Sequence, residues 1–196
     1  MAQEKTIFII PGFAQHPTNK AYIDIAKILK SEGYYPILVD IPWKNTTISQ
    51  NTEYFLKLYK KTKAEKKYIL GFSYGAMIAF IASTKVRSEG LILCSLSPYF
   101  KEDLRKINKN LSLLMTSRYE DFSKLHCETL AKKIKAKKIL MLYGSQEART
   151  LIKRVTGAFN QISSKKKHLI RISKTKHEIG NKKYLNTIHQ ATRELL

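Results

Sequence analysis

A serine between two glycines carries the strongest chemical signal in the sequence, in the pentapeptide Gly71-Phe72-Ser73-Tyr74-Gly75. It directly follows KKYIL, which is typical of a strand, and directly precedes AMIAFIAS, which is typical of a buried helix. A side chain on such a turn projects alone from a strained backbone, and the glycines on either side relieve clashes. The helix N-terminus aims free N–H groups at negative charge formed at the serine, and Tyr74 is placed to give one. The pattern predicts a nucleophile, Ser73, in an elbow made by Gly71 and Gly75.

The pentapeptide resembles the nucleophile elbow of the α/β-hydrolase family, which reads small residue, any residue, nucleophile, any residue, glycine. The resemblance implies three further parts, in this family's layout. These are an oxyanion loop after an early strand, an acid after a late strand and a histidine after the last strand. Pro11-Gly12-Phe13 is similar to the oxyanion loop, with proline where the family often has histidine. Tyr143-Gly144-Ser145-Gln146-Glu147 is similar to the acid turn, with glutamate for the commoner aspartate, and His177 lies in the loop expected for the base.

The resemblance therefore implies a catalytic triad of Ser73, Glu147 and His177. His177 would take the proton of Ser73 and return it to the leaving group, and Glu147 would orient the imidazole and stabilise its cation. The backbone N–H groups of Phe13 and Tyr74 would form the oxyanion hole, where losing one donor costs about 3 kcal/mol in other enzymes. The implied activity is hydrolysis of a small acyl ester or thioester through an acyl-enzyme, with no cofactor and no metal.

Other residues remain open for the acid and the base. Asp103, just after the expected fourth strand, is an alternative acid because some family members place theirs there. Four histidines are alternatives to His177, whose place in the chain order favours it: His16, His126, His168 and His189. Four residues that follow strand ends could line an acyl pocket, although local packing explains each of them equally well: His16, Trp43, Tyr99 and Phe100.

Strands and helices that alternate along the chain must position these groups. Six apolar runs are expected as strands: Thr6 to Ile10, Tyr35 to Asp40, Tyr68 to Leu70, Gly90 to Ser95, Lys138 to Tyr143 and Lys167 to Ile172. Amphipathic or small apolar segments between them are expected as helices: Lys20 to Lys30, Glu53 to Lys63, Gly75 to Lys85, Arg149 to Gln161 and Lys183 to Leu195. Continuously apolar strands are typical of a parallel sheet covered on both faces. The sequence predicts an α/β fold, a three-layer α/β/α sandwich with a mostly parallel six-stranded sheet.

The resemblance implies a minimal α/β-hydrolase without the two antiparallel strands that open larger members, because five residues precede the first strand. The expected strand order, second, first, third, fourth, fifth, is also that of a flavodoxin-like sheet, but Pro11 to Gln15 lacks the hydroxyls and glycines of a phosphate loop. The connection from Leu96 to Ala136, about 40 residues, is long for a crossover and predicts a helical lid or insertion over 97–136. Its apolar run either covers the site or forms the core of a helix pair: Leu111, Leu113, Leu114 and Met115.

Length and composition set the wider limits. The 196 residues, 43% of them apolar, predict one domain, 1–196. The two cysteines, Cys94 and Cys127, have no disulfide or metal spacing, so we expect a reducing compartment. No apolar run approaches the roughly 18 residues of a membrane span, and no cationic leader opens the chain, so we expect a cytoplasmic protein.

A net charge of +21 is compatible with nucleic acid, an anionic membrane surface or an acidic protein as partner. Of the 36 cations 29 are Lys and 7 are Arg, which disfavours specific DNA recognition. One hypothesis is an acidic carrier that presents the acyl chain, steered by Lys132, Lys133 and Lys135. The alternative from another class is a non-catalytic basic α/β module that binds nucleic acid or an anionic surface and keeps the serine turn for its geometry.

Overall fold

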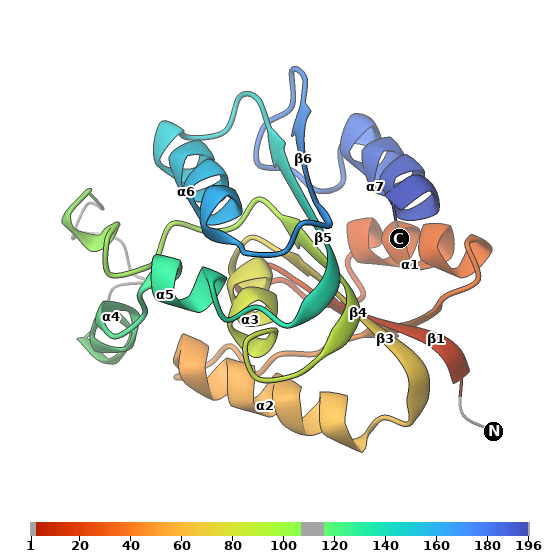
Figure 1. Cartoon of the computed structure of the whole chain (residues 1–196), viewed down its shortest axis with the longest axis horizontal. Helices are drawn as coiled ribbons and strands as arrows, with labels where there is room; N and C mark the ends of the chain where they lie inside the picture. The colour runs from red at the N-terminus through yellow and green to blue at the C-terminus, as the bar shows by residue number, and fades with distance from the viewer. Residues whose placement is uncertain (1–2, 107–115, 196) are drawn as a thin grey trace.

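A computed structural model of the chain, which describes residues 3–106 and 116–195, places a six-stranded sheet between two layers of helices (Figure 1). The strands run β1 (Gln3–Ile10), β2 (Tyr35–Leu38), β3 (Ala64–Phe72), β4 (Ser88–Cys94), β5 (Ala136–Gly144) and β6 (Lys167–Ile172). They lie in the order β2-β1-β3-β4-β5-β6, and all five pairings between neighbours are parallel. The predicted α/β class, three layers and strand order are confirmed.

Five helices cover the two faces of the sheet. Those of the main layers are α1 (Lys20–Ser31), α2 (Ile48–Lys61), α3 (Tyr74–Ala82), α6 (Arg149–Gln161) and α7 (Lys182–Leu195). Buried side chains of α2, α3 and α6 form one hydrophobic core with one face of the sheet, and those of α1 and α7 form a second core with the other face. Because each side chain along a strand points to the opposite face from its neighbour, both cores need apolar residues, which explains the continuously apolar strands.

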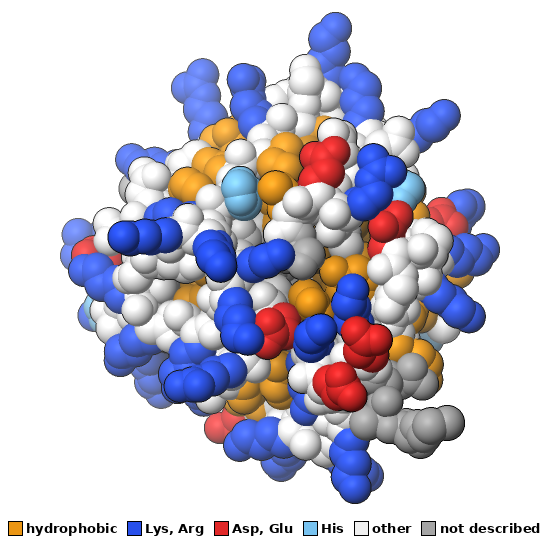
Figure 2. Space-filling view, turned by 45° about the vertical axis from the view of Figure 1, so that its right-hand side comes forward, with side chains coloured by type: hydrophobic (Ala, Val, Ile, Leu, Met, Phe, Trp, Pro, Cys, Tyr) orange, Lys and Arg blue, Asp and Glu red, His pale blue; other side chains and the backbone are white. Residues whose placement is uncertain are grey.

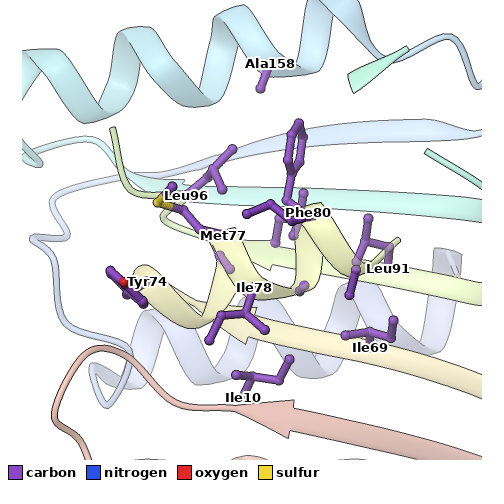
Figure 3. Close-up of a cluster of buried hydrophobic side chains, with 14 of the residues drawn as sticks. Ile10, Ile69, Tyr74, Met77, Ile78, Phe80, Leu91, Leu96 and Ala158 are labelled. Carbon is purple, nitrogen blue, oxygen red and sulfur yellow. The ribbon is translucent and has the colours of Figure 1, made fainter. Parts of the chain in front are cut away.

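Helix α3 lies at the centre of the first core and is buried along its whole length. Figure 3 shows Met77, Ile78 and Phe80 of this helix between strand side chains such as Ile69 and the helix α6 above them, which contributes Ala158. Every one of these side chains is fully shielded from solvent. Burial of this kind contributes about 1.5–3 kcal/mol for each large apolar side chain, so it holds the elbow that opens α3 in place.

Several element boundaries differ from the sequence prediction, and the starts of α2 and β3 differ most. Helix α2 begins at Ile48 rather than Glu53, because Thr47 and Gln50 form a capping box in which each side chain accepts from the other's backbone N–H. Strand β3 begins at Ala64 rather than Tyr68, although its first residues are charged. The side chains of Glu65 and Lys66 are exposed, and that of Lys67 donates to the Tyr59 carbonyl, while the backbone of this segment pairs with β1. The apolar pattern does not register this arrangement.

The long connection between β4 and β5 contains a 3-10 turn, η1 (Leu104–Lys106), and two short helices, α4 (Thr116–Ser123) and α5 (Cys127–Ala131). The helical insertion predicted over 97–136 therefore has helical segments in its described part. The apolar run from Leu111 to Met115 lies outside the described residues, and the prediction that the segment acts as a lid stays a prediction.

Figure 2 shows the surface on the side of α1, α7 and the N-terminus, where blue Lys and Arg side chains cover far more area than red Asp and Glu side chains. This fits the overall charge of +21. Among the helices in the described part of the chain, none is both long enough and apolar enough to cross a membrane.

Candidate active site

Ser73 lies on the sharp turn between β3 and α3, where the sequence predicts a nucleophile elbow. Its backbone has φ 56° and ψ −116°, in the left-handed region that non-glycine residues rarely adopt. Its N–H donates to the carbonyl of Cys94 at 2.8 Å, which fixes the turn to the end of β4. A Cβ on Gly71 would lie closer than 3.0 Å to the backbone of Gly75, and one on Gly75 would collide with the carbonyls of β1 and of Pro11. Both glycines are therefore required by close backbone approach.

A chain of two hydrogen bonds joins three residues that come from separate loops at the carboxyl edge of the sheet. The Ser73 Oγ lies 2.9 Å from Nε2 of His177, and Nδ1 of the same ring lies 3.3 Å from Oε2 of Glu147. With a proton on Nδ1, the ring donates to the carboxylate and accepts the serine hydroxyl. The His177 ring also stacks on Phe72 at a centroid separation of 4.8 Å, which limits its rotation.

The Glu147 carboxylate is fully buried and well supplied with donors. Its Oε1 accepts from the hydroxyl of Ser95 at 2.6 Å and from the N–H of Gly144 at 2.9 Å. The Tyr184 hydroxyl of α7 lies 2.8 Å from the Ser95 Oγ and extends this network. Charge-assisted bonds of this kind offset the cost of burying a carboxylate, so Glu147 stays in one orientation.

The loops that carry Glu147 and His177 are bonded to each other. The N–H of Gln146 donates to the Thr175 carbonyl at 2.9 Å, and the N–H of Lys174 donates to the Ser145 hydroxyl at 2.9 Å. Because these bonds link the two turns on either side of the site, the carboxylate and the imidazole keep their relative position without help from a ligand.

The predicted oxyanion donors come from the loop after β1 and from the first residue of α3. The Tyr74 N–H lies in the first turn of the helix, where backbone N–H groups have no partner within the helix. The Phe13 and Tyr74 rings lie 5.5 Å apart, so the two segments meet. The N–H of Gly12 is bound by the Tyr22 hydroxyl at 2.9 Å, which anchors the loop to α1.

Asp103, the alternative acid, binds elsewhere. Its two carboxylate oxygens accept from Nε and a terminal nitrogen of Arg154 at 2.7 and 2.6 Å, a bidentate ion pair. The four alternative histidines, His16, His126, His168 and His189, are likewise apart from this chain of bonds: His16 binds Thr18, and His189 binds Glu32.

The four candidate pocket residues divide into two groups. Trp43 and Tyr99 join Phe13, Tyr74 and Phe122 in an aromatic cluster next to the elbow, with ring separations of 5.3–6.5 Å. By contrast, His16 lies on the surface, and Phe100 is fully buried against Phe80 in the core of the domain.

Two serines at the end of β4 take part in the site and were not singled out by the sequence analysis. Ser95 supports Glu147, and the Ser97 Oγ lies 3.1 Å from the Ser73 Oγ. Their position directly after the fourth strand was the available signal, because the carboxyl ends of neighbouring parallel strands converge at one edge.

Burial raises the pKa of the Tyr74 hydroxyl well above its usual value, and the nearby Asp121 also raises it whereas Arg118 lowers it. Within the described residues this hydroxyl has no hydrogen-bond partner. As for metals, no three His, Cys, Asp or Glu side chains in residues 3–106 and 116–195 are grouped so that they could hold an ion.

Comparison with known proteins agrees with this geometry at the level of the fold. No family model matches the sequence, and no curated protein matches it either. Among solved structures, Est1E from Butyrivibrio proteoclasticus is similar with a TM-score of 0.83 and 18% identity over 99% of this chain and 87% of that one. The chain therefore has the α/β-hydrolase fold, which confirms the resemblance at this level.

Two other solved structures are similar to the chain over nearly its whole length. Alpha/beta hydrolase domain-containing protein 10 from mouse has a TM-score of 0.78 at 13% identity, covering 100% of this chain and 90% of that one. The monoacylglycerol lipase of Paleococcus ferrophilus has a TM-score of 0.72 at 15% identity, covering 99% and 95%. The shared architecture spans the whole chain in each case, although few residues are identical.

Proposed function

We propose that this protein is a serine hydrolase that cleaves a carboxylic ester or thioester through an acyl-enzyme intermediate. The observation that carries the proposal is the hydrogen-bonded chain from Ser73 through His177 to Glu147, with separations of 2.9 and 3.3 Å. A hydroxyl becomes a good nucleophile when a positioned base takes its proton, and the 2.9 Å between Ser73 Oγ and His177 Nε2 is within the range that such a transfer needs. The fold, which it shares with an esterase-named and a lipase-named structure, supports the same class.

In the proposed reaction, Ser73 Oγ attacks the carbonyl carbon of the substrate while His177 Nε2 takes the hydroxyl proton. The negative charge that forms on the carbonyl oxygen is stabilised by the N–H groups of Phe13 and Tyr74. His177 then gives its proton to the departing alcohol or thiol, and the acyl-enzyme is hydrolysed by water activated in the same way. Glu147 holds the ring tautomer and stabilises the imidazolium that forms twice in each cycle.

Labelling of the purified protein with a fluorophosphonate probe tests the proposal, because the probe reacts only with an activated serine. We expect the wild type to be labelled and Ser73→Ala and His177→Ala to lose labelling. A matched control is Ser83→Ala, a buried hydroxyl at the far end of α3, which should be labelled like the wild type. A folded wild type that is not labelled would contradict the proposal, and an ester and thioester panel would follow a positive result.

The basic binding module is the second candidate function, and one feature favours it. A cavity of about 370 Å³ at the amino edge of the sheet is lined by Tyr68, by Glu89, which pairs with Lys137, and by five lysines: Lys5, Lys66, Lys137, Lys138 and Lys166. Anionic polymers bind such surfaces in a salt-dependent way. Retention on heparin or DNA that persists at physiological salt and is unchanged in Ser73→Ala would support a binding role separate from the serine.

The acidic-carrier hypothesis concerns the same edge. Lys135 directly precedes β5, at the amino end of the strand, whereas Ser73 lies at the carboxyl edge. Nine residues of β5 span about 30 Å, so a carrier docked there would have to reach across the sheet. Replacing Lys132, Lys133 and Lys135 by Glu should raise the KM for a carrier-bound substrate alone; an equal rise for a small soluble ester would contradict the hypothesis.

A further inference from the structure

A groove of about 420 Å³ runs between helix α6 and the segment that follows β4. One wall is formed by residues at four-residue spacing on α6, Arg149, Lys153 and Gly157, which therefore share one helix face. The other wall includes Pro98 and Asp103. Its volume lies in the range of small-molecule sites, and a glycine in the middle of the helix leaves that wall without a side chain. Nothing lies within 4 Å of where a Cβ on Gly157 would be.

One end of the groove adjoins the proposed catalytic groups. Pro98 directly follows Ser97, whose hydroxyl lies 3.1 Å from the Ser73 Oγ. At the same end of the opposite wall, Arg149 follows two residues after Glu147, which binds the histidine. The groove itself is not lined by Ser73, Glu147 or His177, so a substrate bound in it has to extend past Pro98 to reach the nucleophile.

The groove is lined by three cations, Arg149, Lys153 and Arg154, and by two carboxylates, Glu102 and Asp103. Arg154 is paired with Asp103, whereas the Glu102 carboxylate keeps its charge and accepts from the Cys127 N–H with one oxygen. Arg149 and Lys153 are exposed, and their side chains have no ion pair or hydrogen bond within residues 3–106 and 116–195. The segment 107–115, INKNLSLLM, contains no acidic residue.

The position of the groove also indicates which part of a substrate it receives. The leaving group must lie beside His177, which stacks on Phe72, a member of the core that α1 and α7 cover. Helix α6 packs on the other face of the sheet, where its buried side chains belong to the same hydrophobic core as those of α3. The groove therefore lies on the Ser97 side of the nucleophile, away from the leaving group, and is placed for the acyl group.

We propose that this groove is the acyl subsite and that Arg149 and Lys153 recognise a carboxylate on the acyl chain, so that the preferred substrates are half-esters or half-thioesters of dicarboxylic acids. Turnover of such substrates rests on the proposed function, whereas binding of a carboxylate in the groove does not. A guanidinium and an ammonium one helical turn apart can both bind one carboxylate, and the methylene stems of these side chains cover an alkyl chain.

The test compares two esters of equal chain length, the para-nitrophenyl half-ester of glutarate and para-nitrophenyl pentanoate. We expect wild type to prefer the glutarate half-ester, and the double variant Arg149→Gln with Lys153→Gln to lower the ratio of the two kcat/KM values about tenfold, mainly through KM. The matched control is Lys57→Gln with Lys61→Gln, two exposed lysines one turn apart on α2, which removes the same charge and should leave the ratio unchanged. An equal effect of both double variants, or none, overturns the inference.

A binding experiment separates failure of this inference from failure of the proposed function. Free glutarate should raise the Tm of Ser73→Ala more than pentanoate does at fixed ionic strength, and Arg149→Gln with Lys153→Gln in this background should abolish the difference. If no ester is turned over but this binding is found, the subsite stands and the proposed function fails. If pentanoate is turned over while glutarate shows neither preference nor selective binding, the subsite is wrong and the proposed function stands.

Discussion

The hydrogen bond from the Ser95 hydroxyl to the charged Glu147 carboxylate should make a measurable contribution to the free energy of unfolding. It donates at 2.6 Å to a carboxylate that is fully shielded from solvent, so Ser95→Ala removes a hydrogen bond to a buried charge. Such bonds contribute about 1.5–3 kcal/mol, whereas a bond between neutral partners contributes about 0.5–1.5 kcal/mol. For a chain of this size, about 2 kcal/mol lowers the Tm by roughly 4–8 °C. We expect Ser95→Ala to cost about 2 kcal/mol in the wild type and about 1 kcal/mol in the Glu147→Gln background.

Urea unfolding of the four proteins of this double-mutant cycle gives the free energies of unfolding. Two features favour a clean measurement. The Tyr184 hydroxyl keeps the Leu142 carbonyl as a partner at 3.3 Å when Ser95 is truncated, so it is not left unpaired. Ser95 has φ 54°, and Ser95→Gly removes the same hydroxyl while relieving the backbone strain, so it should cost less than Ser95→Ala. Equal costs of Ser95→Ala in the two backgrounds would refute the idea that the bond is charge-assisted.

Two further predictions concern backbone space and the alternative acid. Gly75→Ala should destabilise the fold by more than about 3 kcal/mol, because its Cβ would collide with two carbonyl oxygens. Gly157→Ala, where the Cβ enters open space, should stabilise the fold by about 0.5–1 kcal/mol. Urea unfolding measures both free energies, and a mild effect at Gly75 would contradict the close packing. Asp103→Asn should lower the free energy of unfolding by about 3 kcal/mol, because it leaves Arg154 without its charged partner. The same variant should leave the rate of fluorophosphonate labelling of Ser73 unchanged. A hundredfold loss of labelling in a folded variant would instead make Asp103 the acid.

The architecture was readable from the sequence because its signals are local. Continuously apolar strands such as Thr6–Ile10, followed by amphipathic or fully apolar helices, predicted a parallel sheet covered on both faces. The elbow was equally readable as a motif, and the steric need for Gly71 is local because a Cβ there would meet the backbone of Gly75 and Ala76. The need for Gly75 arises from the distant carbonyls of Ile10 and Pro11 and is visible only in the tertiary structure. The hydrophobic pattern did not register the charged start of β3, which is held by backbone pairing, or the capping box of Thr47, which is held by two side-chain hydrogen bonds.

The site itself depended on contacts between segments far apart in the sequence. Both Glu147 and Asp103 follow strands whose carboxyl ends meet at one edge, so the sequence left the acid open. Sheet register and the hydrogen bonds between two loops bring Glu147 to His177, while Arg154 of α6 pairs with Asp103. The parts that Ser95 and Ser97 take in the site likewise follow only from tertiary structure. Local sterics can be read along the chain, but the partner of a buried carboxylate is decided by where folding places every other donor.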